Sequence, residues 1–451
     1  MIVVSHERNG RGLSQDSPLL IGTGWEGGLY LARKFITMRK ERKLIALGVT
    51  VLLTTMLGAE ARSQDDRLWV LNEGRYDYTA GVLETPPSLG VISGETWSYE
   101  EVLSFPSSNF CTDLKIKGET AFVALENLLV KIDLSAGMVM ESVEVPGIQE
   151  IALVGEDLVV ASRGGLDPET FLPLPLESHV GWWSQEDLTL EGELSLMQGP
   201  NLACQAILVE DEKVFLGINN GWVWGEEVGR LGVWDLGSMT YEEFELDTSA
   251  VNPVALHATN DVILAVSNGD DTNTTLSQWS VSNPSSSASE TLVGVSAGCN
   301  ASAMVNGALA LQIDQENGLR LMDPQSMMWT GEWLNPEAAP AYSLAVHPQW
   351  GWTCSGYTDY VSTGQVVIRT ASGEVLADVP TGISPGTLVW QLGDSTSSIE
   401  TLAASPSAAS KMFDVLGRVT TGYCADPGTP ALRLEVLPSG RVVKKMTVGG
   451  E

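Results

Sequence analysis

The sequence predicts an all-β fold, and three observations support this prediction. Short apolar runs recur along the 451-residue chain, and a short polar turn divides each run into two strands. These turns follow one another at intervals of 37 to 56 residues. Hydrophobic residues make up 43% of the chain and glycine occupies 46 positions, which suits a packed core joined by many tight turns.

The recurring unit is a hairpin. Six hairpins occupy residues 112–125, 149–162, 204–218, 254–267, 301–313 and 342–356. Their turns fall near Gly118, Gly155, Asp211, Asn260, Asn306 and Gln349. Most of these residue types favour the tight turns of hairpins. A repeat of about 40–50 residues with about four strands is typical of a β-propeller blade.

Each repeat continues with two further strands. The third strand ends in a hydrophobic residue followed by aspartate in three repeats, at Asp133, Asp235 and Asp323. This repetition indicates that the blades share one design rather than forming separate domains.

A seventh repeat is divided between the two ends of the domain. Residues 387–393 supply an inner strand, and residues 67–74, 88–93 and 100–105 supply three strands that lack one. Joining the two ends closes the ring, and closure removes exposed sheet edges. We therefore expect residues 64–393 to form a seven-bladed β-propeller, with N- and C-terminal strands in one blade.

The N-terminal region contains the pattern of an export signal. Residues 38–43 are basic, residues 44–57 form a 14-residue apolar run, and residues 59–61 (AEA) offer a small-x-small cleavage site. As a helix this run would span about 21 Å, short of the roughly 30 Å hydrocarbon core of a membrane. We expect residues 38–61 to be a cleaved signal peptide and residues 1–37 to be a mis-annotated upstream extension. No later apolar run is long enough for a membrane span.

The C-terminal region differs in composition from the repeats. Residues 394–410 form a linker rich in Ser, Ala and Pro. Residues 411–451 carry 6 Lys+Arg against 4 Asp+Glu, whereas residues 62–410 carry 11 against 48. We expect residues 411–451 to form a separate, small β-sandwich-like domain, with strands near residues 412–418, 432–437 and 441–448.

Two motifs stand in this tail. Phe413 begins an aromatic-Asp-x-x-Gly-Arg opening, and Gly440 begins a Gly-Arg-x-x-Lys-Lys-x-x-Val ending. The tail thereby resembles the C-terminal sorting domain of the type IX secretion system of Bacteroidota. The resemblance implies the type IX secretion machinery as a partner. It also implies that the protein is secreted or attached to the outer-membrane surface.

The expected propeller opens with the strand Leu-Trp-Val-Leu-Asn-Glu-Gly at residues 68–74. This strand is similar to the opening of YncE-like, surface-layer type β-propellers of the same phylum. Some members of that group capture a corrinoid for an outer-membrane transporter. The resemblance therefore implies a surface binding protein with a corrinoid-like or other small ligand and a transporter as partner.

Charge and cysteine content exclude some classes of function. The chain has 25 Lys+Arg against 57 Asp+Glu, a net charge of −32, which argues against nucleic-acid binding because a binder needs a basic surface for phosphates. The odd count of 5 cysteines argues against a disulfide framework, so we expect small buried thiols. We also expect a monomer.

Ligand contacts are expected in the loops at one face of the propeller, because loops carry contacts while strands supply rigidity. The loops at residues 72–81, 162–183, 219–230 and 355–364 are polar and partly aromatic. We predict that the following residues bind the ligand: Asn72, Arg75, Tyr76, Arg163, Trp182, Trp183, Asn219, Trp222, Trp224, Arg230 and Tyr357. Such a rim could stack on a flat ligand, a sugar or an apolar peptide. Alternatively, the tryptophans pack the loops onto the blades and the arginines are ion-pair partners.

The sequence contains few candidates for metal-binding or catalytic residues. The oxygen-rich stretch at Asp270, Asp271 and Asn273 is a candidate metal loop, with a hairpin turn as the alternative. No nucleotide-binding, hydrolase-elbow or zinc motif occurs, and His257 and His347 fit satisfied core groups. The sequence identifies no catalytic residue and no cofactor. A surface binding protein is the main expectation, and a propeller hydrolase, lyase or quinone-dependent dehydrogenase, or an adhesion component, is the alternative.

Overall fold

The computed structural model describes residues 66–393 except for a few short gaps, and four short strands in the tail. The gaps are residues 78, 168–169, 171, 224, 270–271, 283–286 and 298–300. The expected upstream extension, signal peptide and linker, at residues 1–37, 38–61 and 394–410, lie outside the described residues.

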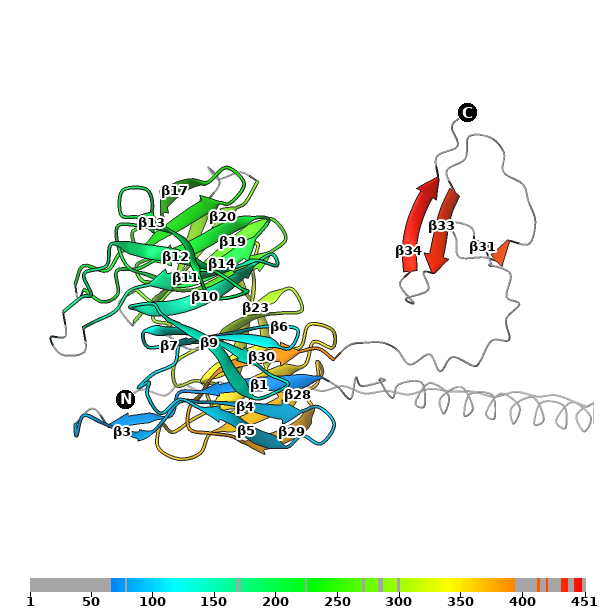
Figure 1. Cartoon of the computed structure of the whole chain (residues 1–451), viewed down its shortest axis with the longest axis horizontal. Coiled ribbons are helices and arrows are strands. Elements are labelled where there is room, and N and C mark those ends of the chain that lie inside the picture. Colours follow the sequence, from blue (N-terminus) through cyan, green and yellow to red (C-terminus); the bar gives the residue numbers. More distant parts are fainter. Residues whose placement is uncertain are drawn as a thin grey trace, which may run out of the picture. The chain divides into compact units, whose positions relative to one another are not determined.

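Residues 66–393 form seven four-stranded sheets, which are the blades of a β-propeller (Figure 1). The prediction of an all-β, seven-bladed domain is confirmed. Blade 1 contains, from inner to outer strand, β30 (Pro385–Gln391), β1 (Arg67–Asn72), β4 (Ser88–Ser93) and β5 (Tyr99–Ser104).

Each of the other blades consists of four consecutive strands, running from the innermost to the outermost. They are blade 2, β6 (Asp113–Lys117), β7 (Thr120–Leu125), β8 (Leu128–Asp133), β9 (Met138–Glu144); blade 3, β10 (Ile148–Val154), β11 (Leu158–Arg163), β12 (Ser178–Ser184), β13 (Leu190–Ser195); blade 4, β14 (Cys204–Glu210), β15 (Lys213–Ile218), β16 (Arg230–Asp235), β17 (Thr240–Glu245); blade 5, β18 (Pro253–Thr259), β19 (Val262–Ser267), β20 (Thr274–Ser280), β21 (Ser287–Leu292); blade 6, β22 (Ser302–Val305), β23 (Ala308–Gln312), β24 (Leu319–Asp323), β25 (Met328–Leu334); and blade 7, β26 (Ser343–Val346), β27 (Thr353–Tyr357), β28 (Gln365–Arg369), β29 (Val375–Pro380).

The predicted hairpin turns join the first two strands of these blades. Gly118, Gly155, Asp211, Asn260 and Asn306 all adopt positive φ, between 47° and 56°, as tight hairpins require. In blade 7 the positive φ falls on Gly351, at 62°, two residues beyond the expected position. Glycine fits this conformation because it has no Cβ to clash with the backbone.

The repeated aspartates act at the turn between the third and fourth strands. The Asp133 Oδ1 accepts hydrogen bonds from the amides of Ser135 and Ala136, at 2.9 and 3.0 Å. Asp235 and Asp323 make equivalent bonds to the turns that follow β16 and β24. These are Asx turns, so the repeated aspartate marks a structural turn and not a binding site.

Blade 1 combines strands from the two ends of the domain. β1 pairs with β30 in antiparallel register, from Arg67 opposite Gln391 to Leu71 opposite Thr387, and the two strands lie side by side in Figure 1. The side chains reinforce the pairing, since Trp69 Nε1 donates to Gln391 Oε1 at 2.8 Å.

The hydrophobic core lies between blades. Seven buried clusters each join two neighbouring blades, beginning with the one around Leu71 and Val123 between blades 1 and 2. The cluster between blades 7 and 1 contains Leu68, Cys354 and Ile368. Each blade therefore buries both faces against its neighbours, and the inner strand β30 lies beside the inner strands β26 and β6.

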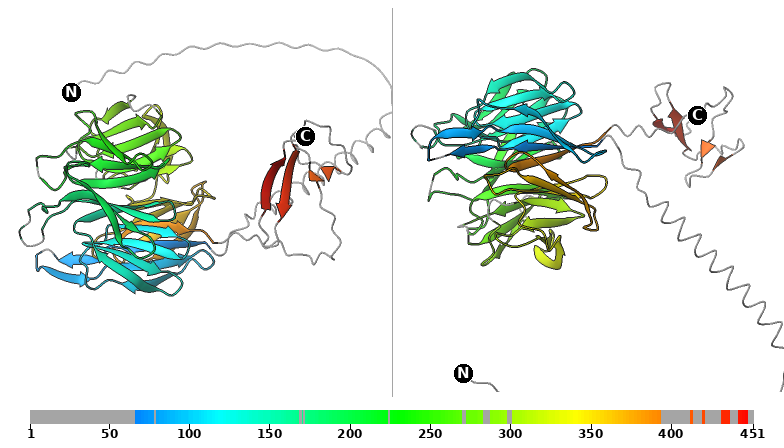
Figure 2. Two further views of the ribbon diagram at one scale, coloured as in Figure 1. Left: turned by 45° about the horizontal axis from the view of Figure 1, so that its top comes forward. Right: turned by 90° about the horizontal axis from the view of Figure 1, so that it is seen from below.

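One hairpin is inserted into blade 1. β2 (Arg75–Asp77) and β3 (Val82–Thr85) lie between β1 and β4 in the chain and pair with each other. This hairpin extends beyond the blades in both views of Figure 2. In the tail, β31 (Met412–Phe413) pairs with β32 (Val419–Thr420), and β33 (Ala431–Val436) pairs with β34 (Val442–Thr447).

Candidate functional site

The predicted contact residues after β1 have partners within the protein. The Asn72 side chain is buried and donates to the Tyr99 hydroxyl at 2.9 Å. Arg75 forms an ion pair with Glu84 across the β2–β3 hairpin, at 2.8 Å. Tyr76 packs on Phe110 with ring centroids 5.6 Å apart.

The expectation that Trp182 and Trp183 lie in a rim loop is wrong, because both lie within β12. Trp183 is 3% exposed and packs between blades 2 and 3. Trp182 packs on Trp234 of blade 4 with ring centroids 4.6 Å apart. The loop is shorter than expected because the chain returns to the sheet at Ser178, where alternate side chains face the neighbouring blades.

The two predicted arginines in blades 3 and 4 form ion pairs with strand residues. Arg163 is 7% exposed, donates to the Pro146 carbonyl and pairs with Glu193 at 2.5 Å. Arg230 pairs with Glu243 and Glu245, at 3.3 and 2.8 Å. Both guanidinium groups thus link strands of one blade to each other or to the preceding loop.

The loop at residues 219–230 contains both buried and exposed residues. Asn219 is buried, and its Nδ2 donates to Gln205 Oε1 at 2.8 Å. Trp222 is 36% exposed and lies over Gly164, where an added Cβ would come within 3.0 Å of the indole. Trp224 lies outside the described residues.

The remaining predicted positions either form hydrogen bonds within the protein or lie outside the described residues. Tyr357 ends β27 and accepts a long hydrogen bond from Arg369 Nη1, at 3.4 Å. Asn273 Oδ1 accepts from the Gly294 amide at 2.8 Å. Asp270 and Asp271 lie outside the described residues.

A cavity opens between the predicted rim loops of blades 4 and 5. It has a volume of about 600 Å³. Its lining comes from the loop after β15, the connection from β17 to β18, the loop after β19, and β21. The lining residues are Gly221, Gly225, Glu227, Thr248, Ser249, Val251, Asn252, Gly269, Asn273 and Thr291. The structure therefore brings the predicted segment 219–230 and the loop after β19 together around one cavity.

The lining of this cavity combines polar and apolar groups. Among its described residues, three glycines expose backbone, hydroxyl and amide groups accompany them, and Glu227 is the single charged side chain. The Asn252 Oδ1 atom is buried without a hydrogen-bond partner, although its Nδ2 donates to Asn268 at 2.6 Å. Such a surface offers directional hydrogen bonds to a ligand with hydroxyl or amide groups.

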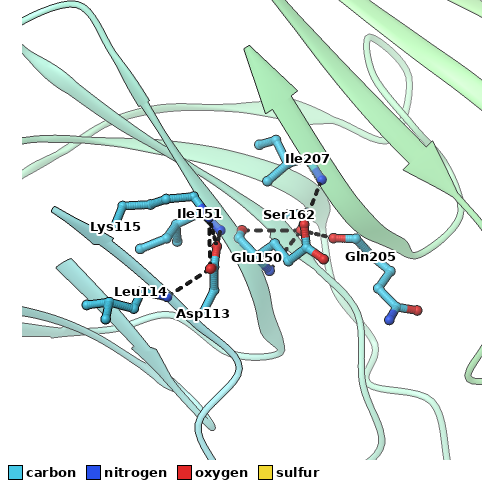
Figure 3. Close-up of polar contacts among 8 residues, drawn as sticks. All are labelled: Asp113, Leu114, Lys115, Glu150, Ile151, Ser162, Gln205 and Ile207. Atoms are coloured by element: carbon cyan, nitrogen blue, oxygen red, sulfur yellow. Dashed lines mark hydrogen bonds and ion pairs between the residues drawn. The ribbon is translucent and has the colours of Figure 1, made fainter. Parts of the chain in front are cut away.

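A second polar cluster joins the inner strands of blades 2, 3 and 4 (Figure 3). Asp113 of β6 accepts from Lys115 Nζ at 2.7 and 2.8 Å, and its Oδ2 accepts from the Ile151 amide of β10 at 2.9 Å. Glu150 of β10 repeats this arrangement, because its Oε2 accepts from the Ile207 amide of β14 at 3.1 Å.

The two donor amides, of Ile151 and Ile207, lie at irregularities in the strand ladders. The β10–β11 register shifts between Ile148 and Ile151, and the β14–β15 register shifts between Cys204 and Ile207. An irregular ladder leaves an amide without its regular partner, and the carboxylate of the preceding blade satisfies it. Each carboxylate thereby ties one inner strand to the next.

Burial perturbs the ionisation of this cluster. Burial and the neighbouring Asp113 carboxylate raise the pKa of Glu150 to about 8, and the Lys115 ammonium opposes this shift only in part. Burial lowers the pKa of Lys115, but the Asp113 and Glu150 carboxylates outweigh it and raise this pKa. Glu150 and Lys115 are half-buried, and composition alone did not single them out in a chain with 57 acidic residues.

The described histidines and cysteines are packed groups. Burial lowers the pKa of His257 to about 4, and its Nε2 lies 2.8 Å from the Ser302 hydroxyl. His347 is fully buried and lies 3.2 Å from Asp66. Cys111, Cys204 and Cys354 are buried free thiols, as expected; the other two cysteines lie outside the described residues.

Two searches of the described residues gave negative results. Within residues 66–393, as far as the structure describes them, no group of three or more His, Cys, Asp or Glu side chains is arranged to hold a metal ion. Among the same residues no helix is long and apolar enough to cross a membrane.

Comparison with known proteins found similarity to solved structures, and this similarity concerns the fold alone. No family model matches the sequence and no curated protein matches it. Among solved structures, the chain is similar to the crystal structure of the Myceliophteria thermophila Cps50 (Swd1) β-propeller domain, with a TM-score of 0.45 and 12% sequence identity. The match covers 59% of this chain and 86% of that one.

Proposed function

We propose that this protein is an exported binding protein that captures a small polar ligand at the loop rim of its propeller. The observation that carries the proposal is the cavity of about 600 Å³ between blades 4 and 5. A space of this size accommodates a small-molecule ligand. Rigid blades hold the surrounding loops, so little conformational freedom needs to be lost on binding.

The cavity lining supports a ligand rich in hydroxyl or amide groups. Ser249, Thr291 and Asn252 present such groups, and Asn252 Oδ1 lacks a partner within the protein. Saccharides have the required hydroxyl groups. The amide side chains of a corrinoid, the ligand suggested by resemblance, would also fit.

The proposed location follows from the chain ends. Residues 38–61 have the pattern of a signal peptide, and residues 411–451 resemble a type IX sorting domain. We place the mature protein outside the cell or on the outer-membrane surface, as a monomer, with the secretion machinery and an outer-membrane transporter as partners. The net charge of −32 favours solubility.

The proposal includes closure of the ring by the two ends of the domain. The antiparallel pairing of β1 with β30 supports this, as does the apolar cluster between blades 7 and 1. A closed ring holds the rim loops at fixed spacing, which a preformed binding site requires.

The test fills the cavity without straining the fold. Gly225 lines the cavity, has φ 82° and has open space at its Cβ position. Gly307 has φ 83° and the same open space in the β22–β23 hairpin turn, outside the cavity. Because the two glycines have nearly the same φ, Gly225→Asn and Gly307→Asn carry comparable backbone costs.

Calorimetric titrations with cyanocobalamin and with a panel of neutral oligosaccharides would measure binding. We expect a member of one of these classes to bind, and Gly225→Asn to weaken this binding by at least about tenfold while Gly307→Asn leaves it unchanged. Equal affinity of both variants would contradict the cavity assignment. Absence of binding by either class would contradict the ligand chemistry.

A further inference from the structure

A carboxylate without a cation partner lies on the same rim, at the junction of blades 7 and 1. Glu73 follows β1 directly, and its amide donates to the Ser384 carbonyl at 2.9 Å. Its side chain extends across β30, where a Cβ added to Gly386 would collide with Glu73 Oε1. The glycine thus makes room for the carboxylate.

The protein satisfies this carboxylate only in part. The Tyr342 hydroxyl lies 2.7 Å from both oxygens and is the one hydrogen-bond donor to them among the described residues. A carboxylate has about four acceptor positions. Glu73 is only half-buried, so further acceptor capacity is available to a ligand.

The charge of Glu73 is also unbalanced locally. Within the described part of the chain, no Lys, Arg or His forms an ion pair with it. Several basic side chains of the domain are paired elsewhere, as Lys115 is with Asp113. Burial raises the pKa of Glu73, and the Tyr342 hydrogen bond opposes this shift. A positively charged ligand would relieve the cost of the buried charge.

Two aromatic rings flank the carboxylate. Tyr342 and Tyr360 pack edge to face, with centroids 5.4 Å apart and an interplanar angle of 83°. Tyr360 lies in the loop between β27 and β28 and is 61% exposed. Aromatic faces attract organic cations through their quadrupoles, so the tyrosines and the carboxylate favour the same ligand chemistry.

We propose that Glu73, Tyr342 and Tyr360 form a recognition site for an alkylammonium group, with the carboxylate as hydrogen-bond acceptor and the tyrosine rings as a partly apolar wall. The group could belong to a small amine or to a lysine side chain. The site is built from blades 7 and 1 and is separate from the cavity between blades 4 and 5. The proposal of an alkylammonium site therefore does not depend on the proposed function.

The test compares a cation with its neutral analogue. Saturation-transfer NMR would follow titration of the full chain with n-butylammonium chloride and, separately, with 1-butanol at matched ionic strength. We expect the ammonium to bind and the alcohol to bind at least about tenfold more weakly, because a charge-assisted hydrogen bond is lost. A peptide with a single lysine and blocked ends then distinguishes a protein side chain from a free amine.

The variants assign the binding to these residues. Glu73→Gln keeps the shape of the side chain and should weaken n-butylammonium binding about tenfold. Tyr360→Leu should weaken it about threefold. Trp333→Leu, which also removes an exposed aromatic ring from the propeller surface, is the matched control and should leave binding unchanged.

The proposal fails if Glu73→Gln binds the amine as wild type does, or if 1-butanol binds as tightly as the ammonium. Should Glu73→Gln fail to fold, the exposed position of Tyr360 keeps the test valid. Tyr360→Leu binding equal to that of wild type would then contradict the site.

Discussion

Replacing Glu150 by glutamine should make the propeller more stable in alkaline solution. The substitution keeps an oxygen that can accept from the Ile207 amide, a bond of 3.1 Å in the wild type. It removes the ability to ionise. The expected result is a gain in the free energy of unfolding that is near zero at pH 4 and largest above pH 8.

The sign follows from the direction of the pKa shift. Burial and Asp113 raise the pKa of Glu150 from 4.5 to about 8. Below about pH 4.5 the carboxyl is protonated in both the folded and the unfolded state. Between that pH and about 8 the unfolded state loses the proton and the folded state keeps it, so the wild type loses stability as the pH rises.

The magnitude has an upper limit set by the shift. Each pKa unit corresponds to about 1.4 kcal/mol, so the full shift corresponds to about 5 kcal/mol. Glu150 is only half-buried, and solvent screens part of its charge. We therefore expect Glu150→Gln to stabilise the domain by about 1–3 kcal/mol at pH 9.

Urea denaturation followed by tryptophan fluorescence, at pH 5 and pH 9, would measure the effect on the full chain. The difference between variant and wild type isolates Glu150 from the other groups that titrate in this range. A difference that is the same at both pH values would refute the reasoning. So would a variant that is less stable than wild type at pH 9.

Four further substitutions test the packing described above by chemical denaturation. Trp183→Ala should cost about 3–5 kcal/mol because it empties a buried site between blades, whereas Trp222→Ala should cost less than about 1 kcal/mol; similar losses would contradict the different burial of the two. Arg163→Met should cost about 2 kcal/mol through loss of the ion pair and of the bond to a backbone carbonyl, and an unchanged midpoint would contradict that role. Gln391→Leu should cost about 1–3 kcal/mol by leaving the buried Trp69 indole N–H unsatisfied. Stability equal to wild type would show that this bond does not stabilise the pairing of β1 with β30.

The blade architecture was predictable because it repeats. Hairpin turns at Gly118, Gly155, Asp211, Asn260 and Asn306 stand between apolar runs, and both signals act locally in the chain. The seven four-stranded sheets follow from that periodicity. In blade 7 the predicted Gln349 lies within the turn between Val346 and Thr353, and the positive φ falls on Gly351.

The site residues were less predictable. Trp182 and Trp183 look like loop aromatics in the sequence, yet they lie in β12 because the connection before it ends at Ser178. Asp113 and Glu150 join neighbouring inner strands because the strand ladders are irregular at Ile151 and Ile207, and no sequence pattern predicts these irregularities. Glu73 stands in a motif noted in the sequence, but its surroundings depend on a contact with Tyr342, 269 positions further along the chain.

The pairing of β1 with β30 has a consequence for how the chain acquires its fold. The hydrogen bond between Trp69 and Gln391 joins residues 322 positions apart. Contacts of such long range form late, because the intervening loop must first be closed. The inner edge of blade 1 therefore stays open until β30, at the end of the domain, has been synthesised and can pair with β1. A chain arrested before residue 385 would expose β1 as a free template for intermolecular strand pairing.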